Sequence, residues 1–416
     1  MSKLIRYKFS DLYSMSSGIS SKPEQAGHGS PFLSFGTVFK NYFIPDSLPD
    51  LMNTSEKEQD TYSIKTGDIF LTRTSETLDE LGMSCVALKD IPKATYSGFV
   101  KRLRPTQTDI TYEGYMGFYL RSKFFRKTMT NNAIMTLRAS LNEDIFSYLN
   151  LYLPEYNIQK KIGDTLLLLN SKIELNNRIN TELEGMAKLL YDYWFVQFDF
   201  PNAEGKPYKS SGGKMVWNGE LKREVPEGWE VGTLLDIADY ANGLPCQKFR
   251  PDGHEFLRVI KIREMNEGGF SDNSEQVKLD IPAKSIIENG DVLFSWSASL
   301  EVKIWTGGKG ALNQHIFKVT SSKYPKSFYY FQLVNYLQHF KMMAENRKTT
   351  MGHITQEHLQ QSRIAIPPKA LTQELDKIIA PLFEMKIKND IENERLSSLR
   401  DWLLPMLMNG QITIDN

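Results

Sequence analysis

The sequence predicts an α+β fold built as an internal repeat, in which each half is a globular part followed by a long helix. Two observations predict it. The segment from Ile158 to Trp194 has apolar residues at steps of three and four, which is typical of one apolar stripe on a helix. The same stripe returns about 213 residues later, between Leu371 and Leu407, and a period of roughly half the chain indicates two similar halves.

The two stripes predict unusually long helices. At 1.5 Å per residue the first segment, about 37 residues, would extend about 55 Å, which favours a coiled-coil strut over a core helix. Its stripe consists of Ile162, Leu166, Leu169, Ile173, Ile179, Leu183, Met186 and Leu190. The second stripe consists of Leu375, Ile378, Leu382, Met385, Leu396, Leu399 and Leu403. Pro381 lies inside the second segment, so we expect it to kink that helix or to delay its start.

The globular parts repeat short motifs in the same order. FSDLYSMSSGI in the first part is echoed by LLDIADYANGL in the second, and TGDIFLTRTS at Gly67-Asp68 is echoed by NGDVLFSWSAS at Gly290-Asp291. Short Val-, Ile- and Phe-rich segments between Gly and Asp turns predict many short strands. We therefore expect five segments: globular parts at 1–152 and 225–366, long helices at 153–198 and 367–410, and a linker rich in Pro, Gly and Ser at 199–224.

Composition excludes several classes of protein. The chain has 50 Lys and Arg against 50 Asp and Glu, so no overall field attracts nucleic acid or membrane. Cys85 and Cys246 lie far apart in unrelated contexts, which argues against a disulfide framework or a thiolate metal site and suits a reducing cytoplasm. The first residues lack the apolar core of a signal peptide, and no apolar run reaches the 18 or so residues that span a bilayer. We expect a cytoplasmic protein.

Catalytic motifs are missing from the sequence. There is no GxGxxG after a strand, no phosphate-binding GxxxxGK[ST] and no Asn- or Asp-Pro-Pro-aromatic sequence. Asp291, Glu301 and Lys303 resemble a nuclease carboxylate set, but this short pattern more often marks a turn aspartate and an exposed strand pair. His353 and His358 are five residues apart, on different helix faces, so we expect no metal site. The sequence predicts no catalytic residue and no cofactor bound by this chain.

Each globular part has a basic segment in its C-terminal half. Such a segment alone is more often a solvated face, but one in each repeat favours contact with DNA phosphates and base edges. The candidates in the first part are Lys101, Arg102, Arg104, Arg121, Lys123, Arg126, Lys127 and Arg138. Those in the second are Lys303, Lys309, Gln314, His315, Arg347 and Lys348. Arg73, Ser295, Trp296 and Ser297 follow the Gly-Asp strands and are candidate base contacts, with turn-stabilising hydrogen bonds as the alternative.

Several segments together are similar to the conserved segments of one protein family. LLYDYWFVQFDFPNAEGKPYKSSGGKM at 189–215 is similar to the central conserved segment of that family. VPEGWEVGTLLDIADYANG is similar to the usual opening of its second recognition domain, and TTMGHITQEHLQQSRIAIPP to the end of such a domain. Gln159 and Gln373 fit the glutamine that follows the family's prolines, which are complete at Pro367-Pro368 but reduced to Pro154-Glu155 in the first half.

With these segments the chain resembles the specificity subunit of Type I restriction-modification systems. The resemblance implies two target-recognition domains separated by two long antiparallel helices with pseudo-two-fold symmetry. It implies binding to a bipartite double-stranded DNA sequence and assembly with two modification subunits and then with restriction subunits. S-adenosylmethionine, ATP and Mg²⁺ are expected on those partners and not on this chain. The alternatives are a stand-alone nuclease or methyltransferase with its own recognition domains, and a coiled-coil interaction protein that binds no nucleic acid.

Asn176 and Asn389 occupy equivalent positions midway along the two stripes. In antiparallel helices related by a two-fold axis, equivalent residues lie opposite each other only at the centre. We therefore predict that the two asparagines meet, or nearly meet, at the pseudo-two-fold axis and fix the helix register, since a buried amide is satisfied in one alignment only. The alternative is that both point to solvent, which Pro381 and Glu392 favour.

Overall fold

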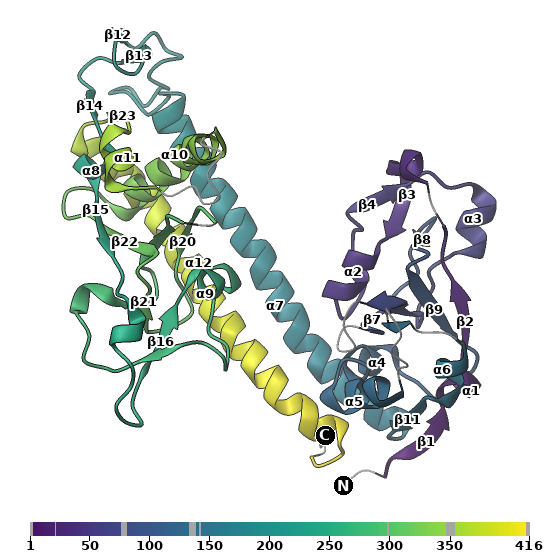
Figure 1. The fold of residues 1–416 in the computed structure, drawn as a ribbon. Coiled ribbons are helices and arrows are strands. Elements are labelled where there is room, and N and C mark those ends of the chain that lie inside the picture. The colour runs from purple at the N-terminus through teal and green to yellow at the C-terminus, as the bar shows by residue number, and fades with distance from the viewer. Residues whose placement is uncertain are drawn as a thin grey trace. The chain divides into compact units, whose positions relative to one another are not determined.

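The computed structural model describes residues 3–20, 22–75, 81–132, 139–140, 143–297, 299–346 and 354–412. The chain forms two compact units (Figure 1). Unit 1 spans residues 1–173 and 396–416, and unit 2 spans 174–395. Each unit contains one globular part and an end of both long helices.

The described residues of unit 1 form three main sheets and a short two-stranded one around an apolar core. Four antiparallel strands have the order β2 (Tyr13–Ser17), β9 (Val100–Pro105), β5 (Ile69–Thr72), β7 (Ser84–Val86). Three more have the order β4 (Asp50–Met52), β3 (Ala26–Leu33), β8 (Thr95–Tyr96), in which β3 and β8 are parallel. The third sheet pairs β1 (Ile5–Lys8) with β11 (Asn150–Leu153). A small bridge joins β6 (Thr74–Ser75) to β10 (Ala139–Ser140).

Short helices cover these sheets. They are α1 (Phe9–Leu12), α2 (Phe35–Lys40), α3 (Glu56–Thr61), α4 (Glu113–Tyr119), α5 (Lys123–Asn132) and α6 (Glu143–Tyr148). The largest core cluster of this unit includes Phe9, Tyr115, Phe118 and Phe125, each fully buried. Burying large aromatic side chains contributes much of the apolar stabilisation of such a core.

Unit 2 repeats this plan. Its first sheet has the order β15 (Asp239–Asn242), β22 (Ile316–Thr320), β19 (Val292–Ser295), β20 (Glu301–Ile304). Its second has the order β17 (Gln276–Val277), β16 (Leu257–Ile260), β21 (Gly310–Leu312), β18 (Ile286–Ile287), in which β16 and β21 are parallel. β14 (Glu230–Gly232) pairs with β23 (Ile364–Ile366). The helices are α8 (Leu234–Ile237), α9 (Ile262–Glu267), α10 (Lys326–Asn346) and α11 (Gln356–Gln361).

The internal repeat predicted from the sequence is confirmed by these matching strand orders. Three features occur in both units in the same chain order. They are the two-stranded sheet (β1–β11 and β14–β23), the four-stranded antiparallel sheet, and the pair of parallel strands (β3–β8 and β16–β21). A hairpin, β12 (Met215–Asn218) and β13 (Arg223–Pro226), lies between the two repeats and belongs to neither. The α+β fold class is therefore correct.

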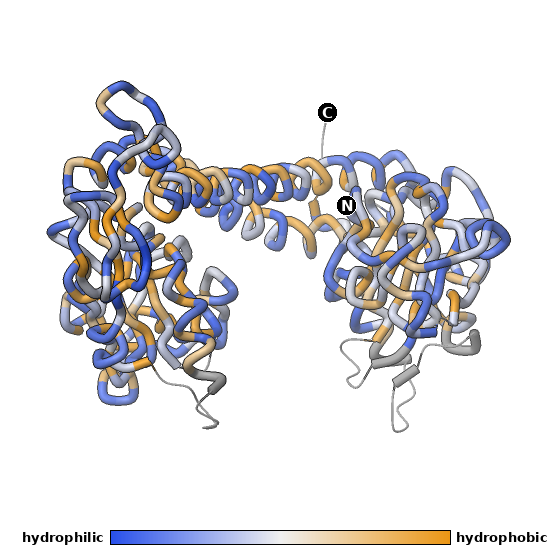
Figure 2. Tube along the Cα trace, turned by 90° about the horizontal axis from the view of Figure 1, so that it is seen from above, coloured by the Kyte–Doolittle hydropathy of each residue, from blue (hydrophilic) through white to orange (hydrophobic). Residues whose placement is uncertain are grey.

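The two long helices are α7 (Tyr156–Tyr191) and α12 (Lys369–Met408), and α7 continues into a π-helical turn at Asp192–Val196 (Figure 1). Figure 2 shows apolar and polar residues changing at short intervals along both, as the stripes predict. They run antiparallel side by side in each unit. Arg400 reaches Asn170 at 3.4 Å in unit 1, and Asn389 reaches Asn180 at 2.9 Å in unit 2.

Pro381 does not delay the start of its helix, which was one of its two predicted effects. Helix α12 begins at Lys369, before the proline, and continues past it. A proline inside a helix removes one backbone hydrogen bond and costs about 3 kcal/mol or more. The burial of Leu375, Ile379 and Phe383, at most 4% exposed, offsets that penalty because these side chains pack into the core of unit 2.

The asparagines of the helix pair form two cross pairs in unit 2. Asn176 Nδ2 donates to Asn393 Oδ1 at 2.9 Å and to Glu392 Oε2 at 2.8 Å, and Asn389 Nδ2 donates to Asn180 Oδ1 at 2.9 Å. The centre of the contact therefore lies between Asn176 and Asn180, one half-turn from the predicted position. Asn176 is 1% exposed, so the solvent-facing alternative is wrong for it. The role of these amides in setting the register stays a prediction.

Candidate nucleic-acid interface

Equivalent strands β5 and β19 each begin at the repeated Gly-Asp turn. Gly67 and Gly290 have φ of 82° and 92°, a left-handed conformation that favours glycine. The carboxylates of Asp68 and Asp291 each accept a backbone N–H three residues earlier, at 2.8 Å in both units. The same turn therefore opens the same strand in both repeats.

Each turn aspartate also holds a cation from the neighbouring strand. Arg104 on β9 donates to both oxygens of Asp68, at 2.8 and 2.6 Å, and Lys318 on β22 pairs with Asp291 at 2.8 Å. The carboxylate of Asp68 raises the pKa of the Arg104 guanidinium. The guanidinium of Arg104 therefore stabilises the turn, a role that the prediction of a DNA contact for Arg104 did not consider.

At their other end, both strands finish with a buried hydroxyl. Thr72 Oγ1 accepts the backbone N–H of Met83 at 2.9 Å, and Ser295 Oγ accepts that of Glu301 at 3.0 Å. Ser295 Oγ also donates to the carbonyl of Ser299, and Ser295 is fully buried. The prediction that Ser295 contacts a base is therefore wrong, and the alternative, a turn-stabilising hydrogen bond, is correct. Ser297 is also buried, at 6% exposure.

The residue that follows the buried hydroxyl makes an equivalent backbone hydrogen bond in both units. Arg73 N donates to Phe99 O at 2.9 Å, and Trp296 N donates to His315 O at 3.3 Å. Ser17 lies opposite Lys101 in unit 1, and Asn242 lies opposite Phe317 in unit 2. In each unit these two pairs of residues give four positions, which we call the strand-end edge. They are Ser17, Arg73, Phe99 and Lys101 in unit 1, and Asn242, Trp296, His315 and Phe317 in unit 2.

The strand-end edge of unit 1 is cationic. Arg73 is exposed, and its guanidinium has no hydrogen bond or ion pair with the residues that the structure describes. Phe99 is 67% exposed beside it, and Lys101 Nζ donates to Ser17 Oγ at 2.7 Å. A free guanidinium next to an exposed ring can form bidentate bonds to guanine and stack on a base.

The strand-end edge of unit 2 is aromatic. The Trp296 ring lies 5.5 Å from His315 and 5.9 Å from Phe317, and its Nε1 donates to Asn242 Oδ1 at 3.1 Å. Gln314 Nε2 lies 3.4 Å from His315 Nε2, so these two side chains share a hydrogen bond. The buried Nδ1 of His315 has no partner among the described residues. Amide, imidazole and indole groups present donors, acceptors and apolar edges for bases.

Three predicted phosphate-binding arginines instead donate hydrogen bonds to backbone carbonyls of unit 1. Arg121 donates to four backbone carbonyls at 2.7 to 2.9 Å, those of Ser84, Val38, Phe39 and Asn41. Arg102 is 8% exposed and donates to Ser63 O at 2.7 Å. Burial lowers the pKa of both guanidinium groups. Arg126 donates to Gly82 O at 3.0 Å. We withdraw Arg121 and Arg102 from the interface because their donors bind the backbone, whereas the assignment of half-buried Arg126 stays a prediction.

The other predicted cations have varied surroundings. Lys123 and Lys127 are exposed on α5, and Lys309 is exposed before β21. Lys303 donates to Asn266 O at 3.0 Å. Arg138, Arg347 and Lys348 lie outside the described residues.

The nuclease-like set does not converge. In the β19–β20 ladder Ser295 lies opposite Glu301 and Val292 lies opposite Ile304, so Asp291 and Glu301 are at opposite ends of the hairpin. Paired carboxylates that hold Mg²⁺ must share one site. No group of three potential metal ligands occurs in the part of the chain that the structure describes.

The sequence matches the Methylase_S family, described as the Type I restriction modification DNA specificity domain, at residues 19–185 and again at 226–400. The two matches cover both repeats. The chain belongs to this family. Sequence-specific recognition of DNA is the function of this specificity subunit, and the two matched domains explain the internal repeat.

Named relatives and a solved structure agree with this assignment. The HindI specificity subunit of Haemophilus influenzae is 26% identical over 323 residues, 65% of this chain and 70% of that protein. The MjaIX specificity subunit of Methanocaldococcus jannaschii is 24% identical over 347 residues, 79% of this chain and 75% of that protein. The crystal structure of the Type I restriction-modification S subunit from M. genitalium has the same fold, with a TM-score of 0.60, 12% identity and coverage of 100% of this chain and 97% of that chain.

For this specificity subunit, sequence reasoning missed several positions at the strand-end edges. Ser17, Phe99 and Asn242 were not candidates, because none carries a charge and none lies on the strand with the Gly-Asp motif. Phe317 is 2% exposed and packs in the core, so it supports Trp296 and is not itself available to a base. The repeated motif FSDLYSMSSGI and LLDIADYANGL places Ser17 and Asn242 before equivalent glycines, which is the one signal available.

No described helix is both long and apolar enough to cross a membrane.

Proposed function

We propose that this chain is the non-catalytic DNA-reading subunit of a Type I restriction-modification complex, and that each strand-end edge reads one half of a bipartite target. The observation that carries this proposal is the contrast between the two edges. Both present four equivalent positions through the same backbone hydrogen bonds, yet the side chains are cationic in unit 1 and aromatic in unit 2. Two half-sites of different sequence require different side chains, which the two units present on the same backbone arrangement.

The test exchanges one recognition domain. Residues 1–150 are replaced by those of a relative, and the positions methylated by the complex are mapped across a genome. The proposal expects a change in one half of the target and no change in the other. A chimera whose target changes in both halves, or in neither, would contradict independent reading by the two units.

We also propose that the long helices dock two modification subunits. On α7, Met186 and Leu189 are 52% and 66% exposed in unit 2. About 213 residues later, Leu399 and Trp402 on α12 are 43% and 63% exposed in unit 1. Exposed apolar pairs at equivalent positions favour two copies of the same partner. Restriction subunits would then join this assembly.

The stoichiometry of the complex tests this docking. Leu189→Glu and Trp402→Glu should each remove one modification subunit, and the double variant should remove both, as measured by the mass of the purified complex. Leu168→Glu is the matched control, because Leu168 is 73% exposed on α7 but its equivalent is Pro381. Full assembly in the double variant would place the modification subunits elsewhere.

The same proposal assigns S-adenosylmethionine, ATP and Mg²⁺ to the partners. The separation of Asp291 from Glu301 along the hairpin supports a non-catalytic chain. Glu301→Gln and Lys303→Ala should leave methylation and cleavage by the whole complex unchanged. Loss of cleavage with intact DNA binding would instead favour a nuclease site in this chain.

A further inference from the structure

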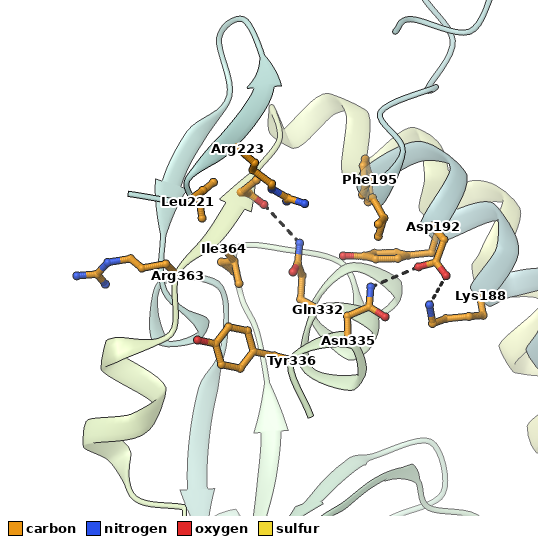
Figure 3. A pocket seen from close by; sticks show the side chains of 13 residues that line it. Lys188, Asp192, Phe195, Leu221, Arg223, Gln332, Asn335, Tyr336, Arg363 and Ile364 are labelled. Atoms are coloured by element: carbon orange, nitrogen blue, oxygen red, sulfur yellow. Dashed lines mark hydrogen bonds and ion pairs between the residues drawn. The ribbon is translucent and has the colours of Figure 1, made fainter. Parts of the chain in front are cut away.

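A polar pocket of about 490 Å³ lies in unit 2 beside the C-terminal end of α7 (Figure 3). Its walls come from α7 with its π-helical turn, from the β12–β13 hairpin, from α10 and from β23. The hairpin belongs to the segment between the repeats, and none of the wall residues belongs to the strand-end edge. The pocket is therefore distinct from the proposed DNA contacts.

One cation of this pocket has no acidic partner among the described residues. Lys188 pairs with Asp192, and Arg363 pairs with Glu220 at 3.2 Å. Arg223 makes no ion pair or hydrogen bond with the described residues, and its guanidinium lies 5.1 Å from the ring centre of Phe198. In Figure 3 the Arg223 side chain extends over the pocket, whereas the Arg363 guanidinium points away from it. The pocket thus presents one uncompensated positive charge.

Other donors in the walls are weakly engaged or unused. Asn335 Nδ2 reaches Asp192 Oδ1, and Gln332 Nε2 reaches Ala365 O, each at 3.4 Å, the long end of hydrogen bonding (Figure 3). The hydroxyl of Tyr191, a residue that is 1% exposed, has no partner among the described residues. A guanidinium with two amides suits an oxygen-rich anion, and arginine binds a carboxylate through two parallel bonds.

The pocket also adjoins an exposed apolar face. Val196 lines it and is 43% exposed, and Met186, Leu189 and Tyr193 precede Val196 on the same helical segment at steps of three and four. These are neighbouring positions on one helix face. A protein packed on that face would bring its own side chains to the mouth of the pocket.

We propose that this pocket takes a carboxylate, from an acidic side chain or a chain end, of the modification subunit that packs on the exposed face of α7. This inference rests on the docking proposed above. Arg223 forms the charge-assisted bonds, and the amides of Gln332 and Asn335 orient the remaining oxygen. A small free anion would offer the same oxygens to the pocket but would not contact the apolar face of α7. Only a carboxylate of the modification subunit predicts that a change at Arg223 alters the affinity of the chain for that subunit.

Affinity is the first measurement. The full chain with Arg223→Glu should bind the modification subunit at least about tenfold more weakly than the wild type, because a lost charge-assisted bond becomes a repulsion. Lys222→Glu is the matched control, an exposed neighbour on the same hairpin outside the pocket, and should change affinity by no more than about twofold.

Cross-linking identifies the group. Arg223→Lys keeps the charge and supplies an amine, which a carbodiimide joins to a nearby carboxylate as an amide while the reagent leaves as a urea. Peptide mapping of the complex should find position 223 linked to an Asp, a Glu or the C-terminus of the modification subunit. Arg250→Lys, at an exposed position outside the pocket, should give no such link.

The outcomes separate the two proposals. If the wild-type chain does not bind the modification subunit, the proposed docking fails. If the wild type and Arg223→Glu bind equally and Arg223→Lys gives no link to the partner, the pocket assignment is overturned while the docking stands.

Discussion

The strand-end edges of the two units have the same backbone and different chemistry. Arg73 and Trp296 occupy one position, held in each unit by the backbone carbonyl of the facing strand. Phe99 and His315 supply those carbonyls and occupy the next position. A hydrogen bond made by the main chain does not constrain the side chain, so these positions can differ while the frame stays intact.

The turn aspartates show the opposite behaviour. Asp68 and Asp291 have the same residue type, the same capped amide and a cation as partner. Here the carboxylate itself makes the hydrogen bonds that stabilise the turn, so few other residue types can replace aspartate at this position. Their burial differs, since the Asp68 side chain is 1% exposed and that of Asp291 is 23% exposed.

The largest expected effect follows from this difference in burial. Asp68→Ala leaves the amide of Lys65 without its acceptor and the Arg104 guanidinium with the carbonyl of Ser63 alone, and breaking a pair with so buried a carboxylate costs about 3 kcal/mol or more. Asp291→Ala should cost about 1 kcal/mol, because the carboxylate of Asp291 is itself reached by solvent. Urea unfolding of the full chain measures both. Equal losses would show that burial does not distinguish the two turns.

The second prediction separates the reading positions. Arg73→Ala should lower discrimination in one half-site by about 1 to 3 kcal/mol, the range for a bidentate contact to guanine. Trp296→Ala should change preference in the other half-site only. Binding of the assembled complex to duplexes altered at each position of either half measures this. An Arg73 variant that loses affinity equally for all sequences would make Arg73 a phosphate contact.

The third prediction concerns the asparagines that join the helices. Replacing Asn176 and Asn393 with Leu should raise the stability of the chain by about 1 kcal/mol, because buried amides cost stability in a helix seam. It should also loosen the preferred spacing between half-sites. Unfolding curves and duplexes with one base pair inserted or removed measure the two effects. Unchanged spacing would place the register determinant elsewhere.

The smallest expected effect is at the first helix of each recognition domain. Asp236 accepts the N–H and the hydroxyl of Thr233 at the start of α8, and these bonds lower the pKa of its carboxyl. Asp236→Ala should cost about 0.5 to 1 kcal/mol at pH 7. Because the folded pKa is the lower one, that difference is present above the unfolded pKa, about 3.9, and is lost as pH falls through the folded pKa.

Unfolding at a series of pH values checks this. Asp11 occupies the equivalent place in α1, where the residue before the helix, Lys8, provides no side-chain cap. Asp11→Ala is therefore the control and should change stability by less than Asp236→Ala. A pH-independent effect of Asp236→Ala would mean that packing, and not the carboxylate, holds α8.

Sequence alone was sufficient for the features that depend on local pattern. Apolar spacing specifies a helix face, so both long helices and the repeat were predictable from steps of three and four and from a fixed offset. The Gly-Asp turns were visible too, because a left-handed glycine and a capping carboxylate are requirements of adjacent residues.

Only the tertiary structure decided which polar residues are available to a ligand. Arg121 and Arg73 are both arginines of unit 1, yet the guanidinium of Arg121 binds four carbonyls from two distant segments, whereas that of Arg73 is exposed and binds none of the described residues. Pro381 is tolerated, and Asn176 pairs with Asn393, through contacts across the helix pair and core. The burial and the hydrogen-bond partners of a residue depend on residues far apart in the sequence. The position of a charged residue or a proline in the sequence therefore does not reveal them.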